Sequence, residues 1–329
     1  MQLLDELKSK VLSINNDEMF DSVALDLFKL HKQSNPIYRQ FVLSLPVSFH
    51  HPKSSKEIPF LPINFFKTHD VLLEGFKAED IFKSSATTGS VPSHNIVPDL
   101  NWYLEVSAKN FAIFYGDIQN YSILALLPSY LEREGSSLVV MANELIEKSK
   151  NQASGFYLNN LDSLHDRLLK AKNEGQKTIL LGVSFALLDF IEKYDLHFPE
   201  LIVMETGGMK GRRKELIREE LHEELKRGFG INTVHSEYGM TELFSQAYSK
   251  GNGLFKLPPW MKFLIRDTND PFEIVGENET GGINIIDLAN IYSCPFIATQ
   301  DLGKINDGKV EILGRFDNSD IRGCNLLAL

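Results

Sequence analysis

Residues 177–183 read Lys-Thr-Ile-Leu-Leu-Gly-Val, a short and almost continuous apolar run. Such a run predicts a strand that is buried on both faces of a sheet. Two similar runs stand at residues 121–127 and 201–204, and a helical pattern follows each run. Strands that alternate with helices are typical of a parallel sheet with helices on both faces, so the expected fold class is α/β. The helices expected after these strands cover residues 136–150, residues 185–193 and a charged stretch through Arg227.

The segments on either side of this core differ from it. The first fifty residues have apolar positions at helix spacing, such as Leu3, Leu7 and Val11. The Pro-containing stretch 58–67 predicts a threading loop or an edge strand, because proline has no N–H to donate to a ladder. After Phe244 short strands and turns predict an antiparallel, β-rich subdomain. The expected domains are an N-terminal helical segment (1–55), an α/β core (56–245) and a β-rich subdomain (246–329).

The composition of the 329 residues, 43% hydrophobic and 24% charged, is that of a globular protein. A net charge of −10 argues against a general nucleic-acid binder, although backbone N–H groups can still bind a phosphate locally. The N-terminus has no signal-peptide pattern, and no apolar run approaches the roughly 20 residues of a membrane span. Only Cys294 and Cys324 occur, with neither disulfide nor zinc spacing. We expect a cytoplasmic protein that is not integral to a membrane.

The stretch from Ser84 to Ser90 is a candidate phosphate-binding loop. It reads Ser-Ser-Ala-Thr-Thr-Gly-Ser, with hydroxyl donors and no large side chain. Small residues let successive backbone N–H groups converge on an anion. The alternative is an ordinary loop, because serine, threonine and glycine are common turn residues.

Residues 237–242, Glu-Tyr-Gly-Met-Thr-Glu, form a second candidate. A strand is expected to end near Glu237, and Gly239 allows a sharp turn. Tyr238 then offers a flat face for a purine, Thr241 a hydroxyl for a phosphate, and Glu242 a carboxylate for Mg²⁺, which prefers one or two carboxylates plus phosphate oxygens. The alternative is a strand-to-helix junction with Thr241 as a cap and Tyr238 in the core.

Two further candidates lie near the end of the sequence. Asp301 could accept hydrogen bonds from both ribose hydroxyls, and Arg315, in Gly-Arg-Phe-Asp, could lie beside a nucleotide. Each also has an alternative: aspartate is common where turns begin, and a turn arginine is often simply solvated. The four candidates in this order suggest an enzyme that activates a carboxylic acid with ATP.

These motifs resemble those of the adenylate-forming superfamily, which includes acyl-CoA synthetases and luciferases. The family's Ser-Ser/Gly-Gly-Thr-Thr-Gly loop corresponds to residues 84–89, with Ala86 in place of a glycine. Its Tyr-Gly-x-Thr-Glu motif is matched at 238–242, its Thr-x-Asp motif at 299–301 and its Gly-Arg-x-Asp motif at 314–317. The resemblance implies the large N-terminal domain of the adenylate-forming fold, with parallel sheets covered by helices and a β-rich subdomain.

The resemblance also implies a reaction in two steps. A carboxylate attacks the α-phosphate of ATP to give an acyl-adenylate and pyrophosphate, and a thiol then takes the acyl group. ATP and Mg²⁺ are the cofactors expected, with Glu242 as the metal ligand. The residues implied in nucleotide binding are Ser84, Ser85, Thr87, Thr88, Gly89, Gly207, Gly208, Tyr238, Gly239, Asp301 and Arg315, and those implied in catalysis are Thr241, Glu242 and Cys324.

A closer likeness is to acyl-protein synthetases of the LuxE type, which are related to phenylacetate-CoA ligases. It lies in residues 59–63, 205–212 and 321–325. In such synthetases a cysteine near the C-terminus carries the acyl group as a thioester, which makes Cys324 the candidate acceptor. The alternative is a small cysteine packed in the core. Cys294, in a predicted strand, is expected in the core.

The superfamily usually continues with a small domain that bears a catalytic lysine, and no such domain follows in this sequence, which is read to Leu329. We therefore expect that domain to be absent. Lys210 and Arg212 are candidates for its cation, and a solvated helix surface is the alternative for them.

Three functions remain open from the sequence. The first is an acyl-protein synthetase, with a fatty acid as the family's usual substrate and a reductase or transferase as a possible partner. The second is a CoA ligase. The third is a nucleotide- or acyl-binding module without turnover.

Overall fold

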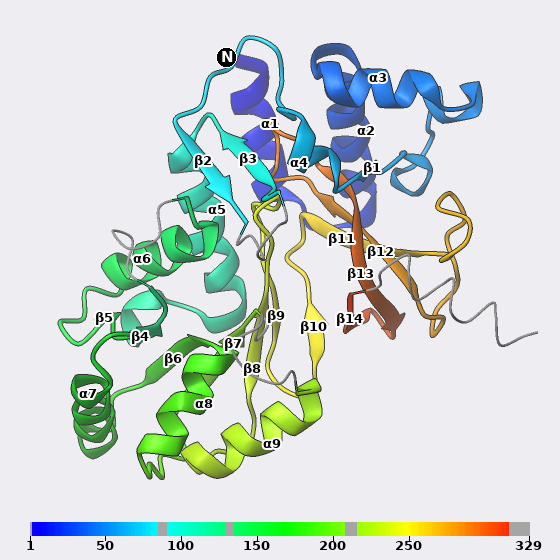
Figure 1. Ribbon diagram of the computed structural model, residues 1–329. Coiled ribbons are helices and arrows are strands. Elements are labelled where there is room, and N and C mark those ends of the chain that lie inside the picture. The colour runs from blue at the N-terminus through cyan, green and yellow to red at the C-terminus, as the bar shows by residue number, and fades with distance from the viewer. Residues whose placement is uncertain (1, 85–90, 129–134, 208–215, 316–329) are drawn as a thin grey trace, which may run out of the picture. The chain divides into compact units, whose positions relative to one another are not determined.

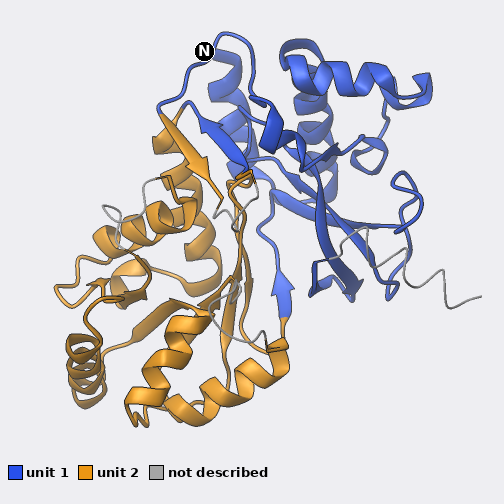
Figure 2. Ribbon diagram, in the orientation of Figure 1, with its two compact units in different colours: residues 1–79, 93–98, 254–329 blue, residues 80–92, 99–253 orange. Residues whose placement is uncertain are grey.

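The computed structural model describes residues 2–84, 91–128, 135–207 and 216–315. The chain divides into two compact units (Figure 2). Unit 1 comprises residues 1–79, 93–98 and 254–329, and unit 2 comprises residues 80–92 and 99–253. The domain boundaries expected from the sequence stay a prediction.

Unit 2 is built on a mostly parallel sheet with the strand order β9-β8-β7-β6-β4-β5 (Figure 1). The strands from β4 to β8 pair in parallel, and β9 pairs with β8 antiparallel. The expectation of parallel strands alternating with helices is confirmed. The strands are β2 (Asp80–Lys83), β4 (Ser122–Leu126), β5 (Gly155–Phe156), β6 (Thr178–Val183), β7 (Ile202–Thr206), β8 (His235–Tyr238) and β9 (Ala247–Ser249); the helices are α5 (Leu100–Tyr115), η3 (Ile118–Asn120), α6 (Ser137–Ser149), α7 (Leu161–Glu174), α8 (Ser184–Lys193) and α9 (Arg218–Phe229).

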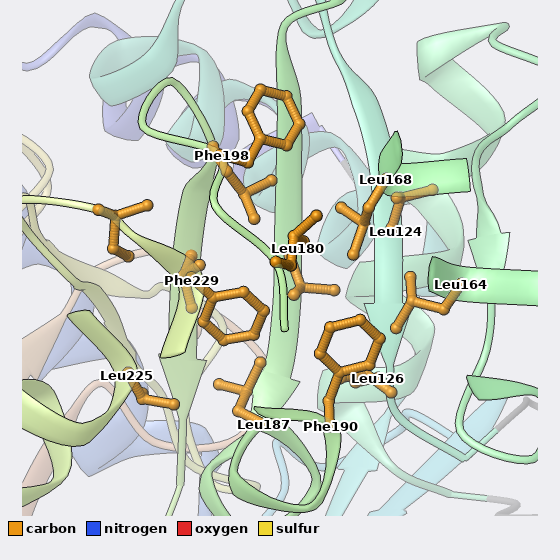
Figure 3. Close-up of a cluster of buried hydrophobic side chains, with 14 of the residues drawn as sticks. Leu124, Leu126, Leu164, Leu168, Leu180, Leu187, Phe190, Phe198, Leu225 and Phe229 are labelled. Atoms are coloured by element: carbon orange, nitrogen blue, oxygen red, sulfur yellow. The ribbon is translucent and has the colours of Figure 1, made fainter. Parts of the chain in front are cut away.

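The core of unit 2 forms where α7, α8 and α9 cover one face of this sheet (Figure 3). Leu180 of β6 contributes to this cluster, whereas its neighbours Ile179 and Leu181 are buried outside it. Alternate residues of a strand point to opposite faces, so the continuous apolar run reflects a sheet that is covered on both sides. The rings of Phe190 and Phe229 stack with centroids 5.6 Å apart and join α8 to α9.

Unit 1 combines the N-terminal helices with an antiparallel sheet of order β11-β12-β13-β14-β10, and β1 pairs with β13 in parallel. The β-rich character expected after Phe244 is confirmed. The helices are α1 (Gln2–Ser13), α2 (Asp17–Ser34), α3 (Pro36–Ser44), η1 (Val47–His50), η2 (Ser55–Glu57) and α4 (Phe65–Thr68); the strands are β1 (Leu61–Pro62), β3 (His94–Val97), β10 (Leu254–Lys256), β11 (Met261–Arg266), β12 (Gly281–Asp287), β13 (Phe296–Asn306) and β14 (Lys309–Arg315).

Local sequence accounts for the helix boundaries in unit 1. The Asn16 side chain accepts a hydrogen bond from the Met19 N–H and caps α2, while Asn35 caps α3, which starts with Pro36. Asn35 also donates to the Ser293 carbonyl at 2.6 Å, so one residue both starts a helix and anchors it to a distant segment. Residues 58–67 were expected to form a loop or an edge strand. Within them, only Leu61–Pro62 forms a strand, and helix α4 begins at Phe65, after the second proline.

No helix in the part of the chain that the structure describes combines the length and the apolar character that crossing a membrane requires.

Candidate functional site

Two candidate segments meet at the carboxyl edge of the sheet in unit 2. Strands β7 and β8 are parallel neighbours, with Thr206 in register with Glu237. Gly207 and Tyr238 therefore follow side by side, although about thirty positions separate them in the sequence. The carboxyl ends of parallel strands are where open α/β sheets bind their ligands. The structure thus brings together two segments that the sequence identified separately.

Gly207 begins the turn after β7. Its φ is +64°, a left-handed conformation that favours glycine, and an added Cβ would meet no atom within 4 Å. Its carbonyl accepts a hydrogen bond from the Ser184 hydroxyl at 2.9 Å, which ties this turn to the first residue of α8. The requirement for glycine here is conformational rather than steric.

The Tyr238–Glu242 segment forms a tight turn. The Leu243 N–H donates to the Met240 carbonyl at 3.1 Å, and the Tyr238 hydroxyl lies 3.8 Å from the Met240 sulfur. Tyr238 and Thr241 are half-buried, while Glu242 is buried. The turn leads to strand β9 and not to a helix, so the interpretation of Thr241 as a helix cap is wrong.

Gly239 is exposed, yet its backbone lies close to the Glu237 side chain. A Cβ built on it would lie 2.6 Å from Oε1 of Glu237, well inside van der Waals contact. The turn therefore rests directly on the Glu237 carboxyl group, and only glycine fits without a shift.

Glu237 itself was not among the sequence candidates. The Thr206 hydroxyl donates to its Oε2, so the carboxyl group links the ends of β7 and β8. The pKa of Glu237 is raised to about 7, chiefly by burial; the Thr206 hydrogen bond opposes this rise and the nearby Glu205 carboxylate adds to it. A glutamate inside a buried strand, directly before the tyrosine, is the sequence signal that could have identified it.

Glu205 lies one residue before Thr206 and makes a separate cluster. His222 Nε2 of α9 is 3.6 Å from Glu205 Oε1, and Arg218 Nε is 4.0 Å from the same oxygen. Because successive residues of a strand point to opposite faces, Glu205 and Thr206 contact different layers of unit 2. The two carboxyl groups at this edge, Glu205 and Glu237, thus have different partners.

Asp301 and Arg315 meet in unit 1. They are register partners on β13 and β14, and Arg315 Nε lies 3.3 Å from Asp301 Oδ1. The Asp301 side chain is 7% exposed and the Arg315 side chain 66% exposed. The arrangement presents a buried carboxylate with an exposed guanidinium beside it, which is chemically suited to a ribose with its hydroxyl donors.

Several candidates lie outside the described residues and stay predictions. Ser84, which is described, directly follows β2 and is half-buried. Cys294 is buried, and burial raises the pKa of its thiol to about 12, so its expected place in the core is confirmed. The candidates outside are Ser85, Ala86, Thr87, Thr88, Gly89, Gly208, Lys210, Arg212 and Cys324.

The donor set near Glu242 fits a magnesium ion that takes most of its ligands from a substrate. Among the described residues no group of three or more histidine, cysteine, aspartate or glutamate side chains could hold a metal. A single buried carboxylate such as Glu242 would suffice for a phosphate-bound magnesium, because this ion keeps water and phosphate oxygens as its other ligands.

Comparison with models of protein families and with curated protein sequences found no match. Solved structures do match. ATP-bound MatB from Rhodopseudomonas palustris aligns with a TM-score of 0.56 and 16% identity, over 71% of this chain and 47% of MatB. The 2-hydroxyisobutyryl-CoA ligase in complex with 2-HIB-AMP aligns with a TM-score of 0.67 and 12% identity, over 91% of this chain and 68% of the ligase. A luciferase-like enzyme from the mealworm Zophobas morio aligns with a TM-score of 0.50 and 17% identity, over 72% of this chain and 57% of that enzyme.

This chain spans about half the length of MatB. The similarity to all three structures establishes the fold: the chain has the α/β fold of adenylate-forming enzymes.

Proposed function

We propose that this chain activates a carboxylic acid with ATP and passes the acyl group to a thiol. In the first step a carboxylate oxygen bonds to the α-phosphorus, and the bond to the leaving pyrophosphate breaks. In the second step a thiolate attacks the acyl carbon, and AMP leaves with the bonding electron pair. The observation that carries the proposal is the Tyr238–Glu242 turn at the carboxyl edge of β8, beside Gly207, within an adenylate-forming fold.

Unit 2 supplies the groups for the purine and the phosphates. The half-buried ring of Tyr238 stacks on adenine, with Gly207 nearby, and the Thr241 hydroxyl contacts the α-phosphate. Glu242 holds Mg²⁺, which would neutralise phosphate charge during the displacement. Ser84, Ser85, Thr87, Thr88 and Gly89 bind the phosphates through hydroxyl and backbone donors.

Unit 1 supplies the ribose contact. Asp301 accepts hydrogen bonds from the ribose hydroxyls, and Arg315, 3.3 Å from that carboxylate, fixes its orientation. Binding two anions in a fixed orientation lowers the barrier by positioning and by electrostatic stabilisation.

The acyl acceptor distinguishes two versions of this function. In the acyl-protein synthetase version, Cys324 takes a fatty acyl group as a thioester. The version with CoA as acceptor is favoured by one observation: a similar structure is 2-hydroxyisobutyryl-CoA ligase in complex with 2-HIB-AMP and CoA. Both versions share the adenylation step.

ATP–pyrophosphate exchange with a panel of carboxylic acids, from acetate to long-chain fatty acids, tests that step. We expect exchange that depends on one class of acid and falls about 100-fold or more in Glu242→Gln. Glu277→Gln, which changes an exposed glutamate of unit 1, is the matched control and should leave exchange unchanged. Nucleotide binding without exchange, for every acid tested, would instead indicate a binding module.

Covalent labelling then identifies the acceptor. With a radiolabelled acid and ATP, Cys324→Ser should lose acyl labelling of the protein and retain exchange. If labelling persists in this variant, or if acyl-CoA forms in its place, Cys324 is not the acceptor.

A further inference from the structure

Arg266 is a buried cation that joins three strands of unit 1. It is the last residue of β11 and is 7% exposed. Its Nη1 donates to the Ile283 carbonyl at 2.9 Å and to Asn284 Oδ1 at 2.8 Å, both on β12. Its Nη2 donates to the Thr299 carbonyl on β13 at 2.5 Å. The guanidinium thus holds two backbone carbonyls on neighbouring strands.

The sheet is irregular at this point. Gly282 is in register with Leu302 and Asn284 with Ala298, so a single β12 residue, Ile283, lies opposite three β13 residues. The three residues are Thr299, Gln300 and Asp301. A bulge of this kind removes regular ladder pairing and leaves polar groups that need other partners. The guanidinium lies against Gly282, where an added Cβ would be 2.5 Å from its Cζ.

The Thr299 side chain completes the bonds within the bulge. Its hydroxyl donates to the Ile283 carbonyl at 2.8 Å and accepts from the Asp301 N–H at 3.1 Å. The backbone of Asp301 is therefore fixed by Thr299, and Thr299 is fixed by Arg266. These bonds replace the regular β-ladder hydrogen bonds next to Asp301, the residue proposed to contact ribose.

A charged group is costly to bury, and here it is retained. Burial lowers the pKa of Arg266 to about 10, and the Asp301 carboxylate opposes that shift. The group stays charged at neutral pH, so the protein bears the cost of a buried cation next to Asp301. Lysine could not replace it, because one ammonium cannot reach two divergent carbonyls in a planar geometry.

We propose that Arg266 and Thr299 are positioning residues that set the Asp301 carboxylate and thereby determine how strongly the enzyme selects ribonucleotides over deoxyribonucleotides. This inference rests on the proposed function, in which Asp301 binds the ribose hydroxyls. Hydroxyl recognition depends on placement, because a hydrogen bond weakens steeply as its angle and distance depart from ideal values. A displaced Asp301 would still leave the adenine and phosphate contacts in place.

The test compares ATP with 2′-deoxy-ATP in the exchange assay and, by calorimetry, in binding. We expect the wild type to prefer ATP, and Asp301→Asn to lose that preference. Thr299→Val keeps the side-chain volume and removes the hydroxyl. Arg266→Lys keeps the positive charge and removes the planar guanidinium that donates to two carbonyls. Each should reduce the preference about tenfold and leave the KM for the acid unchanged. Thr299→Ser keeps the hydroxyl and should keep the preference.

The controls separate this inference from the proposed function. Thr268→Val changes an exposed threonine two residues after Arg266 and should have no effect. If Asp301→Asn loses the preference while Thr299→Val and Arg266→Lys retain it, the positioning role is wrong and the adenylation function stands. A wild type that binds ATP and 2′-deoxy-ATP equally also overturns the inference. If neither nucleotide binds and no acid supports exchange, the proposed function itself fails.

Discussion

Asp301 in unit 1 and Glu237 in unit 2 are both buried carboxyl groups beside a sequence motif, but their surroundings are opposite. Asp301 pairs with Arg315 and attracts the buried Arg266 guanidinium. Glu237 accepts a hydrogen bond from the neutral Thr206 hydroxyl, and its nearest charged influence is another carboxylate, Glu205. In unit 1 cations balance the buried Asp301 carboxylate, whereas in unit 2 burial favours the neutral, protonated form of Glu237. The two regions should therefore respond differently to pH and to substitution.

The largest expected effect concerns the pH dependence of stability at Glu237. Its pKa rises from 4.5 to about 7 on folding, so between these values the folded protein holds a proton that the unfolded chain has released. The free energy of unfolding should therefore fall by up to about 3 kcal/mol as the pH rises from 4.5 to 7, and then level off. Glu237→Gln should remove this fall, as measured by urea unfolding across that range.

Other titratable groups near Glu237 are present in both the wild type and Glu237→Gln. Tyr248 faces it from β9, Glu205 lies on β7, and His235, two residues earlier on β8, has a pKa lowered to about 4 by burial. The His235 contribution has the opposite sign, since stability is lost as the pH falls below 6.5. Unfolding curves of wild type and Glu237→Gln that stay parallel across the range would contradict the role given to Glu237.

A smaller effect is expected from the turn that rests on this carboxyl group. In Gly239→Ala the new Cβ would meet Glu237 Oε1 at 2.6 Å, and the Thr206 hydrogen bond restrains that oxygen's side chain. We expect a loss of about 1–3 kcal/mol in unfolding free energy, together with weaker nucleotide binding. Gly155→Ala is the matched control, because its Cβ meets only the Tyr157 ring at 3.6 Å. Equal stability of the two variants would show that the turn does not depend on this close packing.

The smallest effect is expected at the ion pair of unit 1. The Arg315 side chain is 66% exposed, so solvent screens its attraction to Asp301. Arg315→Gln should lower the unfolding free energy by less than about 1 kcal/mol. Denaturant unfolding at two salt concentrations measures this directly. A loss as large as that expected for Gly239→Ala would mean that the pair is more than a surface interaction.

The fold was largely predictable from the sequence because its signals are local. The runs at 121–127, 177–183 and 201–204 became β4, β6 and β7, since a strand buried on both faces must be apolar at every position. The helices after them appear at 137–149 and 184–193, within two residues of expectation. The stretch 58–67 was harder, because its strand exists only through pairing with β13, far away in the sequence.

Residues of the candidate site were predictable from the sequence only where several of them lie together in one short motif. Tyr238, Gly239 and Glu242 form such a motif, and the structure shows their turn. Glu237 and Arg266 were missed because their roles come from partners elsewhere in the chain. Arg266 in particular ends an ordinary strand, and nothing local shows that Ile283 and Thr299 will turn their carbonyls toward it. The sequence shows which residue types are present, whereas the hydrogen-bond partners of Glu237 and Arg266 depend on the tertiary fold.

The central claim is that Tyr238 and Asp301 each contact the bound adenylate. The most direct test is the affinity of a stable acyl-adenylate analogue, dodecanoyl-sulfamoyl adenosine, measured by calorimetry for wild type, Tyr238→Ala and Asp301→Asn. We predict that each substitution weakens binding about tenfold, because one removes a stacking surface and the other a ribose acceptor. Wild-type affinity in either variant would contradict the claim, because that region would then make no contact with the nucleotide.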